Sequence, residues 1–227
     1  MIKFGRSAKP SEAAPAPVGP PPPAPKVAKR VLVIKLGALG DFIQALAAMK
    51  AIRDYHMGAR ITLLTTEPFT GFAEACPFID VVENDGRPRD PQALAQLVAR
   101  IRQARYDMVY DLQTSGRSSN YFLGLRPWPP LWCGIAPGCS HPHLNPAREQ
   151  MHTLDRLADQ LAVAGIGPPG GYKPEAAPCP ALSWIRTALG NAPRLSPAYF
   201  GLNGPYVLLI PGASPHRPDK RWPAERY

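Results

Sequence analysis

Apolar residues recur along residues 31–164 in two spacings, short continuous runs and longer stretches with a single apolar face. Five short runs, rich in β-branched residues and leucine, predict buried strands: residues 31–35, 61–66, 79–82, 108–112 and 131–135. Four stretches between and after them predict helices: residues 42–55, 70–75, 91–104 and 153–164. Apolar strands that alternate with helices indicate a parallel sheet covered on both faces. We therefore expect an α/β, Rossmann-like domain over residues 30–167.

The composition changes on both sides of that domain. Residues 1–29 are rich in Pro, Ala and Lys and lack periodicity, which predicts a disordered basic extension. Residues 168–204 form a Pro/Gly-rich connector in which we expect a short helix at 182–189. One more apolar run, at 206–210, predicts a strand. Because a lone strand cannot bury its faces, residues 205–227 are expected to begin a second, incomplete domain.

The net charge of +9 indicates an anionic partner, such as a phosphorylated sugar or an acidic membrane surface, or merely a solvated basic tail. Basic residues interleaved with aromatic ones are absent, so nucleic acid is not an expected partner. The four cysteines have no paired spacing and are interpreted as buried thiols of a reducing compartment. No signal peptide or run of about 20 apolar residues occurs, so we expect a cytoplasmic protein that at most contacts the inner membrane peripherally.

The loop that follows the first strand, Lys-Leu-Gly-Ala-Leu-Gly-Asp, is a candidate binding site. Ligands of open parallel sheets bind beyond the carboxyl ends of the strands, and Gly37 and Gly40 would let the backbone approach a bound group. The spacing G-x-x-G-D matches neither the dinucleotide fingerprint nor the P-loop. Asp41 has two compatible interpretations, a helix N-cap and a carboxylate placed to take a proton. Lys35, which ends the strand, is interpreted as a solvated charge or an ion-pair partner.

The polar loop after the fourth strand faces the same edge of the sheet. Gln113, Ser115 and Arg117 could bind carboxylates or phosphates of a substrate, or the loop could simply cap the next helix. His152 is expected to cap the helix that starts at residue 153. The remaining histidines near it, His141 and His143, have no carboxylate or Cys at ligand spacing, so no metal site is expected.

Five segments, in this order, resemble the ADP-heptose:lipopolysaccharide heptosyltransferases, glycosyltransferase family 9: V-L-V-I-K-L-G-A-L-G-D-F-I-Q-A-L, Y-D-M-V-Y-D-L-Q-T-S-G-R-S-S, W-C-G-I-A-P-G, H-T-L-D-R-L-A-D-Q-L-A-V-A-G-I and V-L-L-I-P-G-A-S-P-H-R-P-D-K-R-W-P. The resemblance implies a GT-B architecture, in which one Rossmann-like domain binds the acceptor and a second binds the nucleotide-sugar donor. It further implies an inverting transfer without metal ion or cofactor, from a donor such as ADP-heptose to a lipopolysaccharide core or similar anionic glycan.

The resemblance also assigns roles to individual residues. Asp41 matches the general base, Lys220 a cation near the donor phosphates, and Ser214 a hydroxyl near the donor sugar phosphate. The acceptor side is assigned to the loop residues named above: Gly37, Gly40, Gln113, Ser115 and Arg117. The family's second domain usually continues for about 100 more residues, so we expect little transfer by the 227-residue chain alone.

Two other classes of function stay open at this point. The chain could be a non-catalytic, truncated remnant, or a module that binds the acceptor or a membrane surface. A Rossmann-type oxidoreductase is disfavoured because the dinucleotide fingerprint is missing.

Overall fold

The computed structural model describes residues 27–168, 171–173, 175–189, 196–209 and 218–226. The predicted basic extension therefore lies almost wholly outside the described residues. The chain divides between Ala188 and Leu189 into two compact units, which are described separately below. The domain boundaries expected from the sequence remain predictions.

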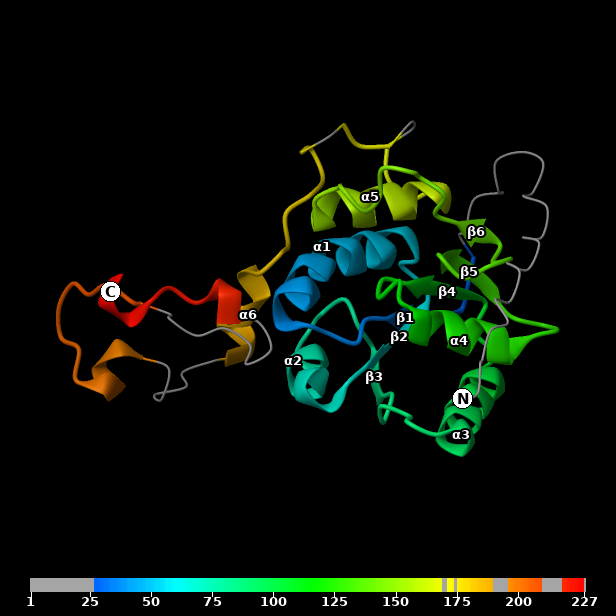
Figure 1. The fold of residues 1–227 in the computed structure, drawn as a ribbon, viewed down its shortest axis with the longest axis horizontal. Coiled ribbons are helices and arrows are strands. Elements are labelled where there is room, and N and C mark those ends of the chain that lie inside the picture. Colours follow the sequence, from blue (N-terminus) through cyan, green and yellow to red (C-terminus); the bar gives the residue numbers. More distant parts are fainter. Residues whose placement is uncertain (1–26, 169–170, 174, 190–195, 210–217, 227) are drawn as a thin grey trace, which may run out of the picture. The chain divides into compact units, whose positions relative to one another are not determined.

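Six parallel strands form one sheet in the order β3-β2-β1-β4-β5-β6 (Figure 1). The strands are β1 Arg30–Ile34, β2 Arg60–Thr65, β3 Val81–Asn84, β4 Met108–Asp111, β5 Leu131–Gly134 and β6 His141–Pro142. The connecting helices are α1 Leu39–Tyr55, η1 Glu67–Phe69, α2 Thr70–Glu74, α3 Pro91–Ala104, α4 Gly116–Leu125, α5 Thr153–Val163 and α6 Ser183–Leu189. The predicted α/β fold with a parallel sheet is confirmed. No helix in the described part of the chain is long and apolar enough to cross a membrane.

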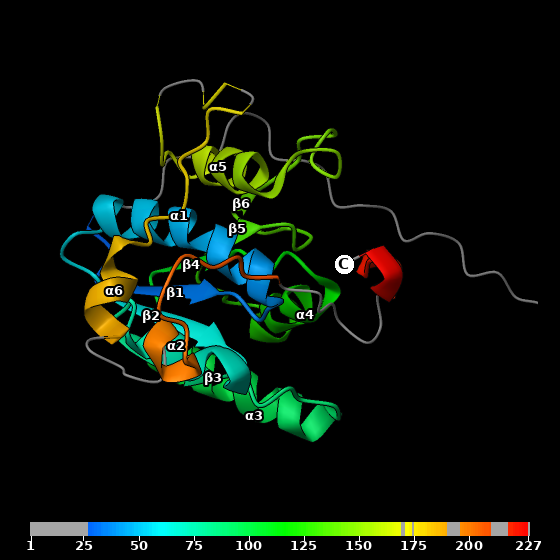
Figure 2. The same ribbon diagram turned by 90° about the vertical axis from the view of Figure 1, so that its left-hand side faces the viewer.

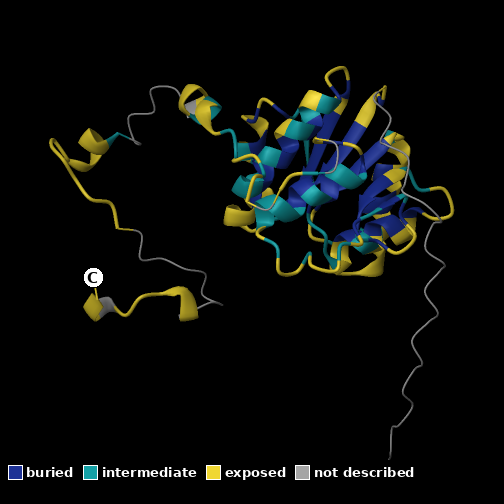
Figure 3. Cartoon of the chain, turned by 90° about the horizontal axis from the view of Figure 1, so that it is seen from above, coloured by how far each residue is buried: buried dark blue, intermediate teal, exposed yellow. Residues whose placement is uncertain are grey.

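Two hydrophobic cores lie on opposite faces of the sheet, with α1 and α5 on one face and α3 and α4 on the other (Figure 2). Successive residues of a strand point to opposite faces. Val31 and Val33 of β1 therefore join the α1 core, whereas Leu32 and Ile34 join the α3 core. Each buried aliphatic side chain of this kind contributes about 1.5–3 kcal/mol. Because both faces of each strand are buried, the strands are continuous apolar runs in the sequence. Figure 3 shows them as the buried centre of the first unit.

Several element boundaries differ from the sequence prediction. Helix α1 begins at Leu39, three residues earlier than expected, and β3 begins two residues later. Residues 79 and 80 were predicted to begin β3 but lie before it. The Asp80 carboxylate instead accepts hydrogen bonds from the Ile61 amide at 2.7 Å and from the Arg53 guanidinium. Helix α4 was anticipated only as the helix that the second loop could cap, without bounds, and the two-residue strand β6 had no predicted counterpart.

The second unit contains three 3₁₀ turns within its described residues: η3 Pro197–Phe200, η4 Pro218–Lys220 and η5 Ala224–Arg226. The predicted strand at 206–210 is wrong for residues 206–209, which have no strand structure and are exposed. The physical reason is that no described strand pairs with this segment, and unpaired backbone gains nothing from an extended conformation.

Candidate functional site

The carboxyl ends of β1 and β4 lie side by side at the centre of the sheet, at the switch point where ligands of open α/β sheets bind in a crevice. From this pair the strand order runs in opposite directions, through β2 and β3 on one side and through β5 and β6 on the other. Loops that leave neighbouring parallel strands in opposite directions separate and leave a space between them, where ligands of open α/β sheets bind. The G-x-x-G-D loop and the loop at 112–115 flank this space.

The backbone of the first loop is held from both sides. The Leu36 amide donates a hydrogen bond to Gln113 Oε1 at 2.9 Å, and Thr66 Oγ1 donates one to the Leu36 carbonyl oxygen at 2.9 Å. Gln113, predicted to bind the acceptor, therefore uses its carboxamide oxygen to position the loop. Its amide nitrogen remains the group through which it could contact a ligand. Thr66 was not singled out from the sequence, because its role depends on the neighbouring strand.

The two glycines of the loop differ in their surroundings. Gly37 has a φ of +134°, and a Cβ there would lie 2.9 Å from Cε2 of the Phe69 ring. Gly40 lies in the first turn of α1, and a Cβ added to it would have no heavy atom within 4 Å. Gly37 is thus required by the fold, whereas Gly40 leaves open space at the mouth of the crevice.

Asp41 lies in the first turn of α1, and its carboxylate is exposed. The N-cap of the helix is Ala38, which has no side-chain capping bond, so the prediction that Asp41 caps the helix is wrong. No described residue donates a hydrogen bond to the Asp41 side chain. The carboxylate is consequently free to contact a ligand at this edge of the sheet.

Lys35 is only 5% exposed, in contrast to the sequence interpretation of a fully solvated charge. Its ammonium is not among the buried side-chain atoms that lack a hydrogen-bond partner. Burial lowers the pKa of Lys35, an effect opposed by the charges of Asp41 and Asp111 and reinforced by Arg156. The residue is buried because β1 ends beneath α1 and α5, a packing that the local sequence does not reveal.

Asp111, at the end of β4, is completely buried. One carboxyl oxygen, Oδ1, accepts hydrogen bonds from the backbone amides of Gln113 at 3.1 Å and Thr114 at 2.9 Å, which shapes the second loop. The other oxygen, Oδ2, has no hydrogen-bond partner among the described residues. Burial raises the pKa of Asp111 to about 6 despite these bonds and the charge of Lys35.

Ser115 and Arg117, at the end of the second loop, form contacts within the protein itself. Ser115 caps α4 in a reciprocal capping box with Ser118, as the alternative interpretation of the loop predicted. Arg117 lies 3.5 Å from the buried Asp85 carboxylate, which also accepts a hydrogen bond from the Tyr121 hydroxyl at 3.0 Å. The Arg117 side chain is nevertheless 40% exposed, so its guanidinium can still reach a ligand.

The residues assigned to the donor lie in the second unit. Lys220 is exposed in η4, and Ser214 lies outside the described residues. Their placement relative to Asp41 remains a prediction. Elsewhere, His152 caps α5 as predicted, accepting a hydrogen bond from the Leu154 amide at 3.4 Å. Of the four cysteines, Cys179 is exposed, in contrast to the prediction that all are buried.

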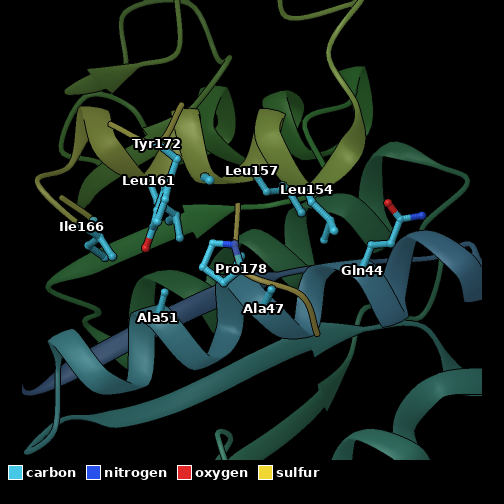
Figure 4. A pocket seen from close by; sticks show the side chains of 12 residues that line it. Gln44, Ala47, Ala51, Leu154, Leu157, Leu161, Ile166, Tyr172 and Pro178 are labelled. Carbon is cyan, nitrogen blue, oxygen red and sulfur yellow. The ribbon is translucent and has the colours of Figure 1, made fainter. Parts of the chain in front are cut away.

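A pocket also lies between α1 and α5, beneath the segment that contains Tyr172 and Pro178 (Figure 4). Its lining is almost entirely apolar, from residues such as Ala47, Ala51 and Leu157, and includes no charged side chain. The crevice at the switch point, in contrast, brings together charged and polar groups from several elements. We therefore place the candidate site at the crevice.

No family model matches the chain. A Haemophilus influenzae protein described as a "putative glycosyltransferase" is 33% identical over 79 residues, which cover 35% of this chain and 23% of that protein. A family 9 glycosyltransferase from Veillonella parvula superposes with a TM-score of 0.62 at 23% identity, covering 87% of this chain and 57% of that one. E. coli ADP-heptose lipopolysaccharide heptosyltransferase II gives a TM-score of 0.51 at 16% identity, covering 86% and 57%.

The chain thus spans a little over half the length of these two solved structures and about a quarter of the curated relative. The resemblance expected from the ordered sequence segments is confirmed at the level of the fold. The chain has the Rossmann-like fold found in family 9 glycosyltransferases.

Proposed function

We propose that this chain supplies the acceptor-binding side of a glycosyltransferase. The proposed reaction transfers heptose or a related sugar, with inversion and without a metal ion, from a nucleotide-activated donor such as ADP-heptose to a lipopolysaccharide core or similar anionic glycan. A lipid-carried acceptor would place the protein at the cytoplasmic surface of the inner membrane. The observation that carries the proposal is the position of Asp41 at the switch point of the sheet. Its carboxylate is exposed and accepts no hydrogen bond from a described residue.

In this reaction Asp41 removes the proton from an acceptor hydroxyl while the hydroxyl oxygen bonds to the anomeric carbon of the donor. The bond between that carbon and the phosphate oxygen breaks, and its electron pair leaves with the nucleoside diphosphate. Lys220 stabilises the charge on the departing diphosphate, and the Ser214 hydroxyl is assigned to the donor sugar phosphate. Arg117, Ser115 and the amide of Gln113, with the backbone at Gly37 and Gly40, orient the acceptor.

The first test measures ADP release that depends on the acceptor, using the protein purified from its native cells. Asp41→Asn removes the base but keeps the size of the side chain, so we expect kcat to fall about 10²–10⁴-fold. Asp54→Asn is the matched control, because Asp54 lies in the same helix and, among the described residues, pairs with Lys50 alone at the surface. Its kcat should stay within about twofold of the wild type.

Unchanged turnover in Asp41→Asn would contradict the assignment of the base. Acceptor binding without any turnover in the wild-type protein would instead favour the alternative function, a non-catalytic binding module. The two outcomes are separated by measuring binding and ADP release on the same samples.

A further inference from the structure

A buried carboxylate, that of Asp85, joins two segments at the edge of the sheet where ligands bind. Asp85 follows β3, and its side chain is completely buried. Its Oδ1 accepts a hydrogen bond from the Arg87 backbone amide at 2.9 Å. Its Oδ2 accepts one from the Tyr121 hydroxyl at 3.0 Å and lies 3.5 Å from Arg117 Nη1. One carboxylate thus connects the loop after β3 to the first two turns of α4.

This connection spans the switch point of the sheet. Strands β3 and β4 lie on opposite sides of β1 in the strand order. Helix α4 follows β4 and packs on one face of the sheet, whereas α1 follows β1 and packs on the other (Figure 2). A ligand at the switch point would therefore lie between the start of α1, which contains Asp41, and the start of α4, which contains Arg117.

The negative charge of Asp85 is not explained by its two hydrogen bonds. The Arg87 amide and the Tyr121 hydroxyl need acceptors, which a neutral asparagine oxygen could also provide, and burying an amide costs less than burying a carboxylate. Burial raises the pKa of Tyr121, so its hydroxyl stays protonated and donates to Asp85. Among the described residues, the ion-pair partner of Asp85 is Arg117. The guanidinium of Arg117 is therefore the group that makes a carboxylate useful at this position.

Arg117 itself is only partly used by this ion pair. Its side chain is 40% exposed although the carboxylate behind it is buried. A guanidinium has five N–H donors in a planar fork, so one side of it can pair with Asp85 while another binds a carboxylate or phosphate. A long side chain that is already held in place loses less conformational entropy when it binds a ligand. Asp85 supplies this restraint from within the fold.

We propose that Asp85 is a positioning residue, which holds the Arg117 guanidinium across the switch point from Asp41 so that it binds an anionic group of the acceptor. The inference rests on the proposed function for the identity of the ligand, whereas the restraint on Arg117 does not depend on it. Asp85 does not contact the ligand, because its side chain is completely buried. It acts on the affinity for the acceptor and not on the proton transfer at Asp41.

The first experiment measures binding of a delipidated lipopolysaccharide core oligosaccharide to the full 227-residue chain by calorimetry. We expect Asp85→Asn to weaken binding about three- to tenfold, which corresponds to the cost of immobilising one long side chain. The same substitution should change the affinity by less than about twofold when Arg117 is already replaced by Gln, because the effect passes through Arg117. The control Asp107→Asn also removes a carboxylate that accepts backbone amides, those of Lys29 and Arg30 at the opposite edge of the sheet, and should bind as the wild type does.

Arg117→Lys provides a second variant, which leaves the buried carboxylate in place. Lysine keeps the positive charge but donates from a single nitrogen, so it cannot reproduce the fork that pairs with Asp85 on one side and with an anion on the other. We expect its affinity for the oligosaccharide to fall to nearly that of Arg117→Gln. In the ADP-release assay, Asp85→Asn and Arg117→Lys should both raise the KM for the acceptor, with kcat within about twofold of the wild type.

NMR relaxation of the Arg117 Nε–H group tests the restraint without any ligand. Its order parameter should be lower in Asp85→Asn than in the wild type. Equal order in the two proteins, additive effects of Asp85→Asn and Arg117→Gln on affinity, or wild-type affinity in Arg117→Lys would each overturn the inference. If the wild type does not bind the oligosaccharide, the proposed acceptor is rejected, and the relaxation result alone decides whether Asp85 positions Arg117.

Discussion

Gly37 and Gly40 are both glycines of the loop after β1, but only Gly37 lies where a side chain would not fit. At Gly37, an Ala would combine a φ of +134° with a Cβ 2.9 Å from the Phe69 ring. We expect Gly37→Ala to lower the free energy of unfolding by about 1–3 kcal/mol. Gly40→Ala should leave stability unchanged or raise it by up to about 1 kcal/mol, because Ala favours the helix and the space is open. Urea denaturation of both variants tests this, and equal losses would contradict the distinction.

Asp111 gives a prediction about pH. Burial raises its pKa to about 6, whereas Asp in an unfolded chain titrates near about 3.9. Between these values the folded state holds a proton that the unfolded state has released, so this group's contribution to stability falls as pH rises from about 4 to 6. Asp111→Asn lacks this effect. Its stability relative to the wild type should therefore increase over that window by up to about 3 kcal/mol and level off above pH 6.

The prediction is stated as a difference from the wild type because His56 makes stability change with pH in the opposite direction. Burial lowers the pKa of His56 to about 4, so its contribution to stability falls as pH decreases below about 6.5. His56 is present in both proteins and cancels in the difference. Urea denaturation at several pH values measures that difference, and a curve that is flat with pH would show that Asp111 titrates normally in the folded protein.

At the scale of single residues, the sequence predicted the location of the site better than the state of its groups. The loop after β1 could be identified because glycines and an Asp follow an apolar run. The N-cap assignment of Asp41 was wrong because α1 begins at Leu39, and apolar spacing does not locate a helix start closely. Burial of Lys35 and Asp111 depends on helices more than 100 and 40 residues away along the chain, respectively, so no local pattern reveals it.

At the scale of elements, helices α3 and α4 pack closely through Gly124. A Cβ at this position would lie 2.9 Å from Val98 Cγ2 and 3.3 Å from Cγ1. We expect Gly124→Ala to destabilise the protein by about 1–3 kcal/mol through overpacking, and Val98→Ala to do so by a similar amount through a cavity. In the double variant the new methyl group occupies the vacated space.

The double variant should therefore lose less stability than the sum of the single losses, by at least about 0.5 kcal/mol. Thermal or urea unfolding of the four proteins completes the cycle. Strict additivity would mean that α3 and α4 do not meet at Gly124.

The elements that the sequence predicted well are those whose burial pattern is regular. Helix α3 was predicted with its observed bounds, because its apolar face is clear and Pro91 marks its start. Helix α4 was missed although Ser115 provides a cap and Tyr121, Phe122 and Leu125 an apolar face. The loop before it was recognised as a possible cap for a following helix, but no bounds were assigned to that helix. Strand β6 has two residues, too few for any periodicity.

At the scale of the whole molecule, the two cores of the first unit account for the fold. Every buried residue of both cores lies between Ala28 and Ile166. In residues 196–226, no side chain that the structure describes is buried, and Tyr199, Phe200 and Trp222 are exposed. The hydrophobic stabilisation of the described residues therefore lies in the first unit, as expected of a domain that folds on its own.

This organisation predicts that the chain ending at Leu189 keeps the stability of the full chain, with a Tm within about 2 °C, because every buried core residue precedes residue 190. A shorter chain ending at Ala181 also lacks α6, whose Trp184 ring lies 5.3 Å from that of Phe72 at the margin of the α1 core. Exposing this aromatic contact should cost about 1–3 kcal/mol and lower the Tm by several degrees. Calorimetry of the three chains separates these cases. A large Tm loss already at Leu189 would show that residues 190–227 contribute to the stability of the first unit, and that this unit does not fold independently.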